Sequence, residues 1–470
     1  MLLTLLACAP TADRVETLSI GEVTGSVSPE FLSFAVDSGQ VAGTVFWSED
    51  PTATEPEVGI APYDFTRPAL GLLAAELSPA WLRIGGTDAD RLYYDLGEGL
   101  SEPPDGYRGT LTEAQLQGAV DFAEAAGLQL FFTLNAGPSS RDEAGEWQPD
   151  NAQALLQWTA ERQAPIGLWE LGNELNGYAL LHGESVSPET YGRDLQTLAS
   201  LRDAHTPDAL VAGPSSAYWP VNGEFLGFME DALSQGGEHL DVVTWHYYPQ
   251  QSERCPLQSR LATPETMLAT DALDEGQLWA DQVEGHRDDS APHAQVWLGE
   301  TGNAQCGGQP GVSDAFASSF WWLDQLGWLA QRGQPVVIRQ TLSGADYALI
   351  DESTLEPNPD YWVSVLHKRL MGPQVLQISG GGPLRVYAHC DAENTTLAVI
   401  NPSDESVLLD LGRQELWLLQ ADDLADRQIT LNGEPLSAPD GVLPPLEPVI
   451  DHPLFPSRSL GFVRLEGGCP

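Results

Sequence analysis

The stretch Ile166-Gly-Leu-Trp-Glu-Leu-Gly-Asn-Glu174 decides the fold, because it reads as an apolar strand that ends in a glycine turn, an amide and a carboxylate. A second run, Trp297-Leu-Gly-Glu-Thr301, also closes on a glutamate. Strands of a parallel α/β barrel deliver side chains in this way to the rim where barrel enzymes do chemistry. Cleavage of a glycosidic bond needs two such carboxylates, one as proton donor and one at the anomeric carbon. We therefore expect Glu174 and Glu300 to be catalytic, with the amide of Asn173 beside them.

Acids are so abundant in this chain that a single glutamate is more simply explained as a solvated surface group. The chain has 68 Asp and Glu residues, and a lone Asn-Glu or Gly-Glu pair is a motif with a high false-positive rate. Context favours catalysis, because both glutamates close β-like runs (166–171 and 294–298) within a long alternation of strand and helix patterns.

Strand and helix patterns alternate over most of the chain. Further strands are predicted at 33–37, 82–87, 128–134, 211–215, 242–248 and 336–340, and helices at 112–126, 151–163, 187–205 and 313–332. Thr112 is the expected N-cap of one helix and Gly127 its terminating residue. This alternation predicts an α/β fold, a (β/α)8 TIM barrel. The long loops at 38–67 and 249–266 point to binding at the barrel rim.

After Gly372 the pattern changes to short alternating runs separated by Gly, Pro, Asn and Asp, which predict a C-terminal all-β, β-sandwich-like domain. The early stretch 17–27 is also strand-like and is expected to complete that domain. We therefore divide the chain into four parts. These are a signal- or lipoprotein-like segment and tether (1–15), a strand joining the β domain (16–29), a catalytic barrel (30–372) and a β-sandwich-like domain (373–470).

The charge is strongly acidic. The 68 acids against 21 bases give a formal net charge of −47, and Lys368 is the only lysine. Nucleic-acid binding is excluded because no basic footprint exists. A carboxylate-rich surface suits high salt, so we expect a saline habitat; a GC-rich genome would explain the missing lysine but not the excess of acids. No cofactor or metal is expected, and the protein is expected to be a monomer.

The N-terminal run from Met1 to Cys8 places a small residue and a cysteine after several leucines, as in a bacterial lipoprotein processing site. It lacks a basic n-region and is short, so a misassigned start codon and a chance likeness remain alternatives. We expect a secreted protein or a cell-surface lipoprotein, with Cys8 as the lipidation candidate and the lipid as its only membrane contact. Export would also allow the other four cysteines to pair, in any of three connectivities.

Several collinear motifs together resemble the heparanase group of glycoside hydrolase family 79. They include Leu168–Asn176, Val243–Tyr248, Val296–Thr301, Glu30–Phe34, Ser78–Thr87, Pro359–Trp362 and Leu384–Cys390. The resemblance covers nearly the whole chain. It implies a (β/α)8 barrel with a β-sandwich-like second domain, and retaining cleavage of a β-linked glucuronic acid. Glu174 would be the acid/base and Glu300 the nucleophile, with carboxyls ~5–5.5 Å apart.

The resemblance also implies roles for surrounding residues. Substrate contacts would come from Asp37, Thr87, Asn173, His246, Tyr248, Gly307, Gly308, Gln340 and Tyr347. Among these, the two glycines and Tyr347 would receive the uronate carboxylate through N–H and O–H donors, and Tyr248 would bond Glu300. Arg83 would orient a catalytic carboxylate. Taken alone, Thr87 is more simply a turn residue, Tyr248 a core tyrosine and Arg83 half of a buried ion pair.

Cys390 and Cys469 match a family disulfide, and we expect that pair together with Cys255–Cys306. The chain departs from the family where Cys306 replaces the first glycine of a triplet and where the segment 344–347 is one residue shorter. The basic stretches with which animal heparanases grip sulfated chains are not evident, Arg254 and Arg260 being the nearest candidates. The internal linker of the animal proenzyme is also missing from 95–110, which implies an enzyme active as a single chain.

The expected function is therefore endo-acting cleavage of internal β-glucuronide linkages in heparan-sulfate-like glycosaminoglycans. An exo-acting β-glucuronidase on unsulfated glycans or small glucuronides is the alternative. A more remote alternative is a non-catalytic carbohydrate-binding lipoprotein.

Overall fold

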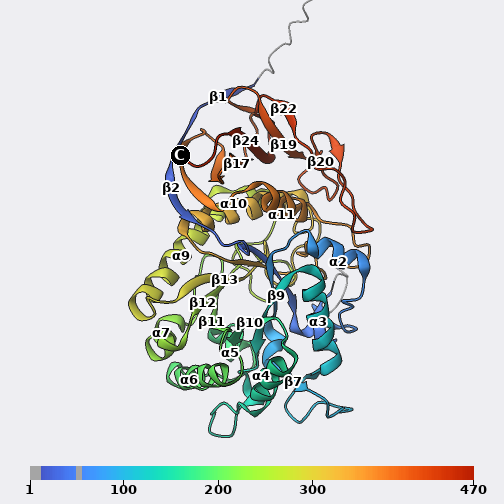
Figure 1. Cartoon of the computed structure of the whole chain (residues 1–470), viewed down its shortest axis with the longest axis vertical. Helices are drawn as coiled ribbons and strands as arrows, with labels where there is room; N and C mark the ends of the chain where they lie inside the picture. The colour runs from blue at the N-terminus through green and yellow to red at the C-terminus, as the bar shows by residue number, and fades with distance from the viewer. Residues whose placement is uncertain (1–11, 49–54) are drawn as a thin grey trace, which may run out of the picture.

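The computed structural model describes residues 12–48 and 55–470 and has two parts, a parallel barrel and an antiparallel β domain beside it (Figure 1). Cys8 and most of the segment 1–15 lie outside the described residues. Within the described ranges, no helix has the length and apolar character needed to cross a membrane.

Eight parallel strands close into the barrel, which confirms the predicted fold class. In chain order they are β3 (Leu32–Asp37), β6 (Ala80–Gly85), β9 (Leu128–Leu134), β10 (Ile166–Leu171), β11 (Leu210–Tyr218), β12 (Val242–Tyr247), β13 (Gln295–Thr301) and β14 (Val337–Arg339). Each strand pairs with the next, and β14 closes on β3 with Val337 opposite Leu32. All eight C-terminal ends therefore meet on one rim.

A long helix follows each barrel strand. These helices are α2 (Pro68–Ala75), α3 (Glu113–Ala126), α4 (Asp150–Arg162), α6 (Pro188–His205), α7 (Met229–Gly236), α9 (Thr270–Ser290), α10 (Phe316–Arg332) and α11 (Pro359–Leu370). Helix α3 begins and ends as predicted: Thr112 forms a capping box with Gln115, and Gly127 ends it in the left-handed region at φ 71°. The predicted helix 313–332 begins three residues later, at Phe316.

Shorter elements decorate the barrel. They are α1 (Ser38–Ala42), β4 (Val45–Trp47), β5 (Glu57–Gly59), η1 (Thr87–Arg91), β7 (Leu92–Asp95), β8 (Gly109–Thr112), η2 (Pro138–Ser140), η3 (Leu175–Gly177), α5 (Tyr178–Leu181), η4 (Gly237–His239) and α8 (Pro264–Leu268). Most of them lie in the connections that follow barrel strands, so they build the rim. The long loops expected at 38–67 and 249–266 contain α1, β4, β5 and the start of α8.

The β domain contains two sheets, the larger antiparallel and the smaller mixed, and includes the N-terminal strands. Its larger sheet has the order β2 (Leu18–Ser26), β15 (Gln374–Gly380), β16 (Arg385–Cys390), β17 (Asn394–Asn401), β24 (Ser459–Glu466), β19 (Gln414–Gln420), β20 (Thr430–Leu431) and β21 (Glu434–Pro435), with β22 (Val449–Asp451) beside β19. The smaller sheet joins β1 (Arg14–Glu16), β18 (Val407–Leu409) and β23 (Leu454–Phe455). A disulfide links Cys390 to Cys469, as expected.

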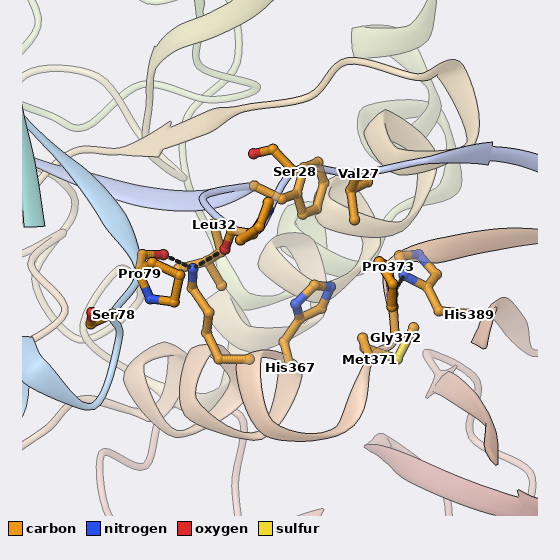
Figure 2. A pocket seen from close by; sticks show the side chains of 13 residues that line it. Val27, Ser28, Leu32, Ser78, Pro79, His367, Met371, Gly372, Pro373 and His389 are labelled. Carbon is orange, nitrogen blue, oxygen red and sulfur yellow. Dashed lines mark hydrogen bonds between the residues drawn. The ribbon is translucent and has the colours of Figure 1, made fainter. Parts of the chain in front are cut away.

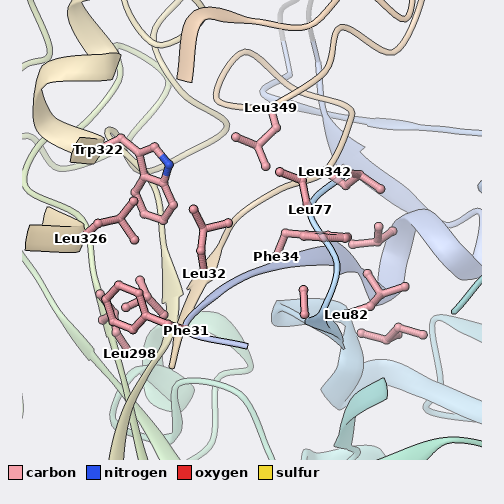
Figure 3. Close-up of a cluster of buried hydrophobic side chains, with 14 of the residues drawn as sticks. Phe31, Leu32, Phe34, Leu77, Leu82, Leu298, Trp322, Leu326, Leu342 and Leu349 are labelled. Atoms are coloured by element: carbon pink, nitrogen blue, oxygen red, sulfur yellow. The ribbon is translucent and has the colours of Figure 1, made fainter. Parts of the chain in front are cut away.

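Helix α10 connects the two parts, because both of its faces are buried. Trp322 and Leu326 pack with Leu32 and Leu298 in the apolar cluster at the barrel (Figure 3). On the opposite side Gly327 lies against the ring of Tyr387, so closely that a Cβ there would come within 2.1 Å of that ring. The same tyrosine donates to Asp324 of the helix at 2.6 Å.

A cavity lies where the N-terminal end of the barrel meets the β domain, lined by Phe31, Pro79, His367, Lys368 and His389 among others (Figure 2). The Lys368 ammonium donates to the carbonyl oxygens of Pro29 and Pro79, which precede β3 and β6. The single lysine of the chain therefore ties α11 to the starts of two barrel strands.

Replacing Lys368 by methionine should lower the free energy of unfolding by about 1–2 kcal/mol, because two carbonyls lose their N–H donor. Arg413→Met is the matched control, since that cation donates to a single carbonyl, Ile450, at the surface. Chemical denaturation of both variants measures the difference. Equal midpoints for the two variants would remove the structural role of Lys368.

Candidate active site

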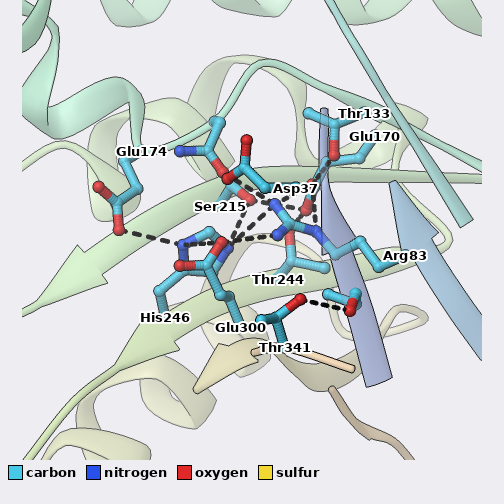
Figure 4. Close-up of polar contacts among 12 residues, drawn as sticks. Asp37, Arg83, Thr133, Glu170, Glu174, Ser215, Thr244, His246, Glu300 and Thr341 are labelled. Atoms are coloured by element: carbon cyan, nitrogen blue, oxygen red, sulfur yellow. Dashed lines mark hydrogen bonds and ion pairs between the residues drawn. The ribbon is translucent and has the colours of Figure 1, made fainter. Parts of the chain in front are cut away.

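The rim of the barrel carries a cluster of buried polar side chains from several strands (Figure 4). Arg83 comes from β6, Glu170 from β10 and Glu300 from β13, while Glu174 follows β10. Their strands are distant in sequence and are brought together only by closure of the barrel. Glu300 lies inside β13 rather than beyond its end, since that strand runs on to Thr301.

Arg83 is the centre of this cluster and is fully buried. Its Nε and Nη2 donate to Glu170 Oε2 at 3.1 and 2.8 Å, and its Nη1 donates to Glu300 Oε2 at 2.7 Å. Nη2 also donates to Asn173 Oδ1 at 2.9 Å. Burial disfavours the charge on Arg83, but the two carboxylates outweigh it and raise its pKa. Gly85 makes room, because a Cβ there would lie 2.6 Å from Arg83 Cζ.

Glu170 is the partner that the sequence patterns did not single out. Besides Arg83, it accepts from Thr133 Oγ1 at 2.7 Å, Ser215 Oγ at 2.7 Å and Thr244 Oγ1 at 2.8 Å. Burial raises the pKa of Glu170, but Arg83, His246 and the hydroxyls together bring it below the ordinary value. The sequence feature that could have identified Glu170 is its place within an apolar strand, since a buried carboxylate requires a charged partner.

Glu300 is held as a carboxylate by two donors. Tyr248 OH donates to Oε1 at 2.7 Å while Arg83 occupies Oε2. Burial acts to raise the pKa of Glu300. The charges of His246 and Arg83 and the hydrogen bond from Tyr248 lower this pKa by more than burial raises it, so the net shift is downward. Burial and Glu300 raise the pKa of Tyr248 well above its usual range, so the phenol stays a donor. This arrangement suits a nucleophile.

Glu174 sits in a turn after β10 with a left-handed backbone, φ 55° and ψ 52°. Such a conformation is costly for a residue other than glycine and persists only where its surroundings enforce it. Here the N–H of Glu174 donates to the carbonyl of Ser215 at 3.1 Å. Asp90, also missed from the sequence, accepts from the N–H groups of Asn173 and Ala136 at 2.9 Å each. Burial raises the pKa of Asp90 to about 6.

His246 connects Glu174 to the buried network, with its Nδ1 3.2 Å from Glu174 Oε1 and its Nε2 3.0 Å from Ser215 Oγ. The single hydroxyl hydrogen of Ser215 goes to Glu170, so this oxygen accepts from His246. Nε2 therefore carries a hydrogen. The two hydrogens of Arg83 Nη2 go to Glu170 and Asn173, so the guanidinium does not compete for it.

The tautomer of His246 determines where one further proton lies. With Nε2 protonated, a neutral ring offers Nδ1 only as an acceptor, so the hydrogen between Nδ1 and Glu174 belongs to the carboxyl group. If the ring is charged instead, Nδ1 donates to an ionised Glu174. Either arrangement would place one proton between the two groups at the mouth of the site, where a general acid would use it.

Two tyrosines and a glycine turn lie beside Glu300. The rings of Tyr248 and Tyr347 are 6.4 Å apart. Gly307 and Gly308 are left-handed, with φ 79° and 83°, and a Cβ on Gly308 would meet Tyr347 N at 2.6 Å. The Cys255–Cys306 disulfide, also as expected, ties this turn to the loop after β12.

The remaining predicted site residues are spread along the rim. Asp37 ends β3 and accepts from the N–H of Gly39 at 2.8 Å, and burial with the nearby Asp88 and Glu300 raises its pKa well above normal. Gln340 follows β14 and hydrogen-bonds Tyr347. Thr87 opens η1 and is partly exposed. The structure brings Gln340 and Tyr347 together but gives Thr87 no hydrogen bond within the cluster.

One group here has ligand atoms close enough for a metal ion, since atoms of Glu174, His246 and Glu300 lie within 4.8 Å of one another. Both oxygens of Glu300 already accept from cationic or phenolic donors, Arg83 and Tyr248. A guanidinium bonded to a ligand oxygen opposes a second cation there. The geometry is better suited to acid–base chemistry.

Comparison with known proteins identifies the family of the chain. The family model for the N-terminal domain of glycosyl hydrolase family 79 matches residues 57–327. The chain belongs to glycosyl hydrolase family 79. The resemblance inferred from the motifs is thereby confirmed.

Curated family 79 relatives include heparanases from animals. Heparanase of Rattus norvegicus is 31% identical, over 92% of this chain and 88% of the rat protein. Heparanase of Gallus gallus is 30% identical, over 100% and 97% respectively. Inactive heparanase-2 of Mus musculus is 31% identical, over 74% and 62%. Overall identity therefore does not separate active from inactive members.

Solved structures show the same fold at low identity. A family 51 α-L-arabinofuranosidase from Bifidobacterium longum has a TM-score of 0.66 at 16% identity, covering 97% of this chain and 100% of that one. A 4-O-α-L-rhamnosyl-β-D-glucuronidase from Fusarium oxysporum has a TM-score of 0.63 at 13% identity, covering 96% and 98%. These likenesses support the barrel with its β domain in this family 79 chain.

Arg83→Met should destabilise the protein by about 3–5 kcal/mol at neutral pH, because two buried carboxylates lose their counter-charge. The wild type has Glu170 and Glu300 with lowered pKa values, so it should lose stability as the pH falls below about 4.5. In the variant the unpaired acids should instead gain from protonation, which moves its stability maximum to lower pH. Denaturation across this pH range is the measurement.

Arg464→Met is the control for Arg83→Met, because it breaks a partly exposed pair with Glu415. It should cost less than about 1 kcal/mol. Parallel stability–pH curves for the wild type and Arg83→Met would contradict the assignment of Arg83 as the counter-charge.

Nitrogen-15 NMR of the imidazoles should show His246 with a hydrogen on Nε2 at every pH where the protein is folded. Ser215→Ala should allow both tautomers, since the fixed acceptor is gone. Ser319→Ala is the matched control, because that buried hydroxyl has no hydrogen-bond partner in the described structure. Detection of the opposite tautomer, with Nδ1 alone protonated, would refute the proton placement.

Proposed function

We propose that this protein is a retaining glycoside hydrolase that cleaves internal β-glucuronide linkages of heparan-sulfate-like glycosaminoglycans. The observation that carries the proposal is the pairing of Glu174 with Glu300, whose carboxylate oxygens approach within 4.8 Å. Carboxyls ~5–5.5 Å apart are typical of retaining enzymes, whereas inverting enzymes need room for a water between them.

The unequal surroundings of the two carboxylates support their division of roles. Glu300, held ionised by Arg83 and Tyr248, would attack the anomeric carbon and form a glycosyl ester. Glu174, whose Oε1 lies 3.2 Å from His246 Nδ1, would protonate the leaving oxygen and then take a proton from the water that releases the sugar. Side-chain exposure of 16% for Glu174 and 9% for Glu300 leaves both within reach of substrate.

The proposed glucuronate specificity draws on the relatives and on the turn beside Tyr347. The matched relatives include heparanases over nearly the full chain. Glycines 307 and 308 have left-handed backbones, and N–H groups in such a turn can form anion sites without needing a cation. Tyr347 lies against them. A carboxylate of the sugar would be bound there.

An exo-acting β-glucuronidase would use the same chemistry and would differ only in having a cleft that is closed beyond the glucuronate subsite. We also propose that the protein acts outside the cytoplasm. Its two disulfides support this, because they persist in oxidising compartments.

Glu300→Gln should lower turnover of an aryl β-glucuronide by more than ~10³-fold while leaving the fold intact. Glu174→Ala should keep activity on leaving groups that need no proton, and azide should restore a β-glucuronyl product. Glu184→Gln, an exposed acid of the rim, is the control and should match the wild type.

Product analysis separates the candidate functions. Shortened heparan sulfate without free glucuronate supports endo action, and free glucuronate with an intact polymer supports exo action. Proton NMR of the first product should show the β anomer. Binding of the polymer without turnover of any glucuronide would make the protein a non-catalytic binder and refute the proposal.

A further inference from the structure

We infer that the leaving-group side of the cleft binds an uncharged sugar, so that the enzyme cuts glucuronides within unsulfated stretches of its polymer. The inference rests on the proposed function and specifies its substrate class. It follows from the surface beside Glu174 and from the partners of the rim arginines.

The place of the leaving group follows from the acid. Glu174 would protonate the leaving oxygen, so the next sugar lies on its side of the cleft. Two residues after it, Asn176 bonds both backbone groups of Ala217 on β11 at 2.9 Å and reaches the carbonyl of Phe225 at 3.5 Å. One side chain therefore joins the turn of the acid to the end of β11 and to the loop 219–228.

This loop and the next one form a single surface. Asn222 Nδ2 donates to Ser259 Oγ at 2.8 Å. Glu275 accepts from both loops, from Val221 N at 3.1 Å and from Arg260 Nη1 at 2.9 Å. The loop after β11 and the loop after β12 are thus joined at the rim.

The joined loops expose apolar side chains, which we call the apolar rim. It consists of Trp219, Val221, Phe225, Leu226, Leu257 and Leu261. Phe225 is 48% and Leu226 55% exposed, and the Trp219 ring contacts Phe225 at 5.7 Å. Clustered exposed apolar groups usually mark binding sites, and in this chain they are present despite a net charge of −47. The C–H face of an uncharged pyranose packs well on such side chains.

The arginines of the rim loops are already paired with acids of the chain. The pairs are Arg91–Asp88, Arg108–Asp88, Arg141–Asp194, Arg254–Asp346 and Arg260–Glu275, with closest distances of 3.1, 2.8, 2.8, 2.6 and 2.9 Å. Arg67 donates to the carbonyl of Glu352. Lys368 lies at the opposite end of the barrel, and the sequence 49–54 contains no basic residue.

A sulfate group is bound by arginine or lysine through charged hydrogen bonds. At this rim the arginine charges are already offset by neighbouring acids, so a sulfate would gain less from them and would also meet the repulsion of the acidic surface. A neutral N-acetylated sugar meets neither cost. The apolar rim and the paired arginines therefore favour the same ligand.

The first experiment compares three substrates at low and high salt. They are glucuronyl fluoride, which has no leaving sugar, an unsulfated glucuronate–N-acetylglucosamine polymer, and highly sulfated heparan sulfate. At low salt, kcat/KM should be roughly tenfold or more higher for the unsulfated polymer. High salt should reduce the difference in kcat/KM between the two polymers, because it screens the repulsion between the sulfated polymer and the acidic protein.

Two substitutions test the apolar rim directly. Phe225→Ser should raise KM for the unsulfated polymer several-fold and leave glucuronyl fluoride unchanged. Phe225→Arg should raise kcat/KM for the sulfated polymer several-fold at low salt. Ile450→Ser and Ile450→Arg are the controls, because Ile450 is similarly exposed, at 55%, but lies on β22 of the β domain.

The outcomes separate this inference from the proposed function. Turnover of glucuronyl fluoride with equal or greater activity on the sulfated polymer would overturn the inference alone. The same holds if both Phe225 variants behave like their Ile450 controls. Failure of the folded wild type to turn over glucuronyl fluoride and both polymers would overturn the proposed function itself.

Discussion

The site depends on one buried guanidinium that bridges two carboxylates. Arg83 joins three barrel strands, because its partners Glu170 and Glu300 lie on β10 and β13. Taking three charges out of water is costly unless every lone pair is satisfied. Thr133, Ser215 and Thr244 supply those donors. The network that stabilises the barrel centre therefore also holds the proposed nucleophile, so loss of Arg83 should affect both stability and reactivity.

The two carboxylates proposed to be catalytic are held in different ways. Glu300 lies within a strand and is fixed by side chains on neighbouring strands, whereas Glu174 lies in a left-handed turn that backbone contacts and Asp90 stabilise. A nucleophile must keep one position at the anomeric carbon. An acid/base has to serve first a leaving oxygen and then a water, and a turn at the cleft mouth allows such small adjustments.

Much of the fold and two residues of the site could be predicted from local sequence patterns. The remaining features depend on contacts between residues that are distant in the chain. Thr112 and Gly127 bound α3 because capping is local chemistry. The barrel followed from alternating strands and helices, and the two carboxylates from their places after apolar runs. Helix α9 was not predicted, since it begins after Ala269 without a side-chain cap, whereas the equally polar α6 begins after the cap Ser187. Glu170 was missed because strand sequence alone does not reveal which acid faces a buried arginine. The partners of the rim arginines appear only once the loops are folded together.

The pairing of β2 with β15 has a consequence for synthesis of the chain. Ser26 lies opposite Gln374 in an antiparallel ladder, so one of the first strands made waits for a partner made after the whole barrel. Until then β2 carries an open edge, and open edges invite association between chains. The alternating polar and partly buried residues of β2, with its glutamate and glycines, make it a poor template for such association. The last hundred residues therefore supply the partner strand of β2 only after the whole barrel has been synthesised, and the polar edge of β2 protects it until then.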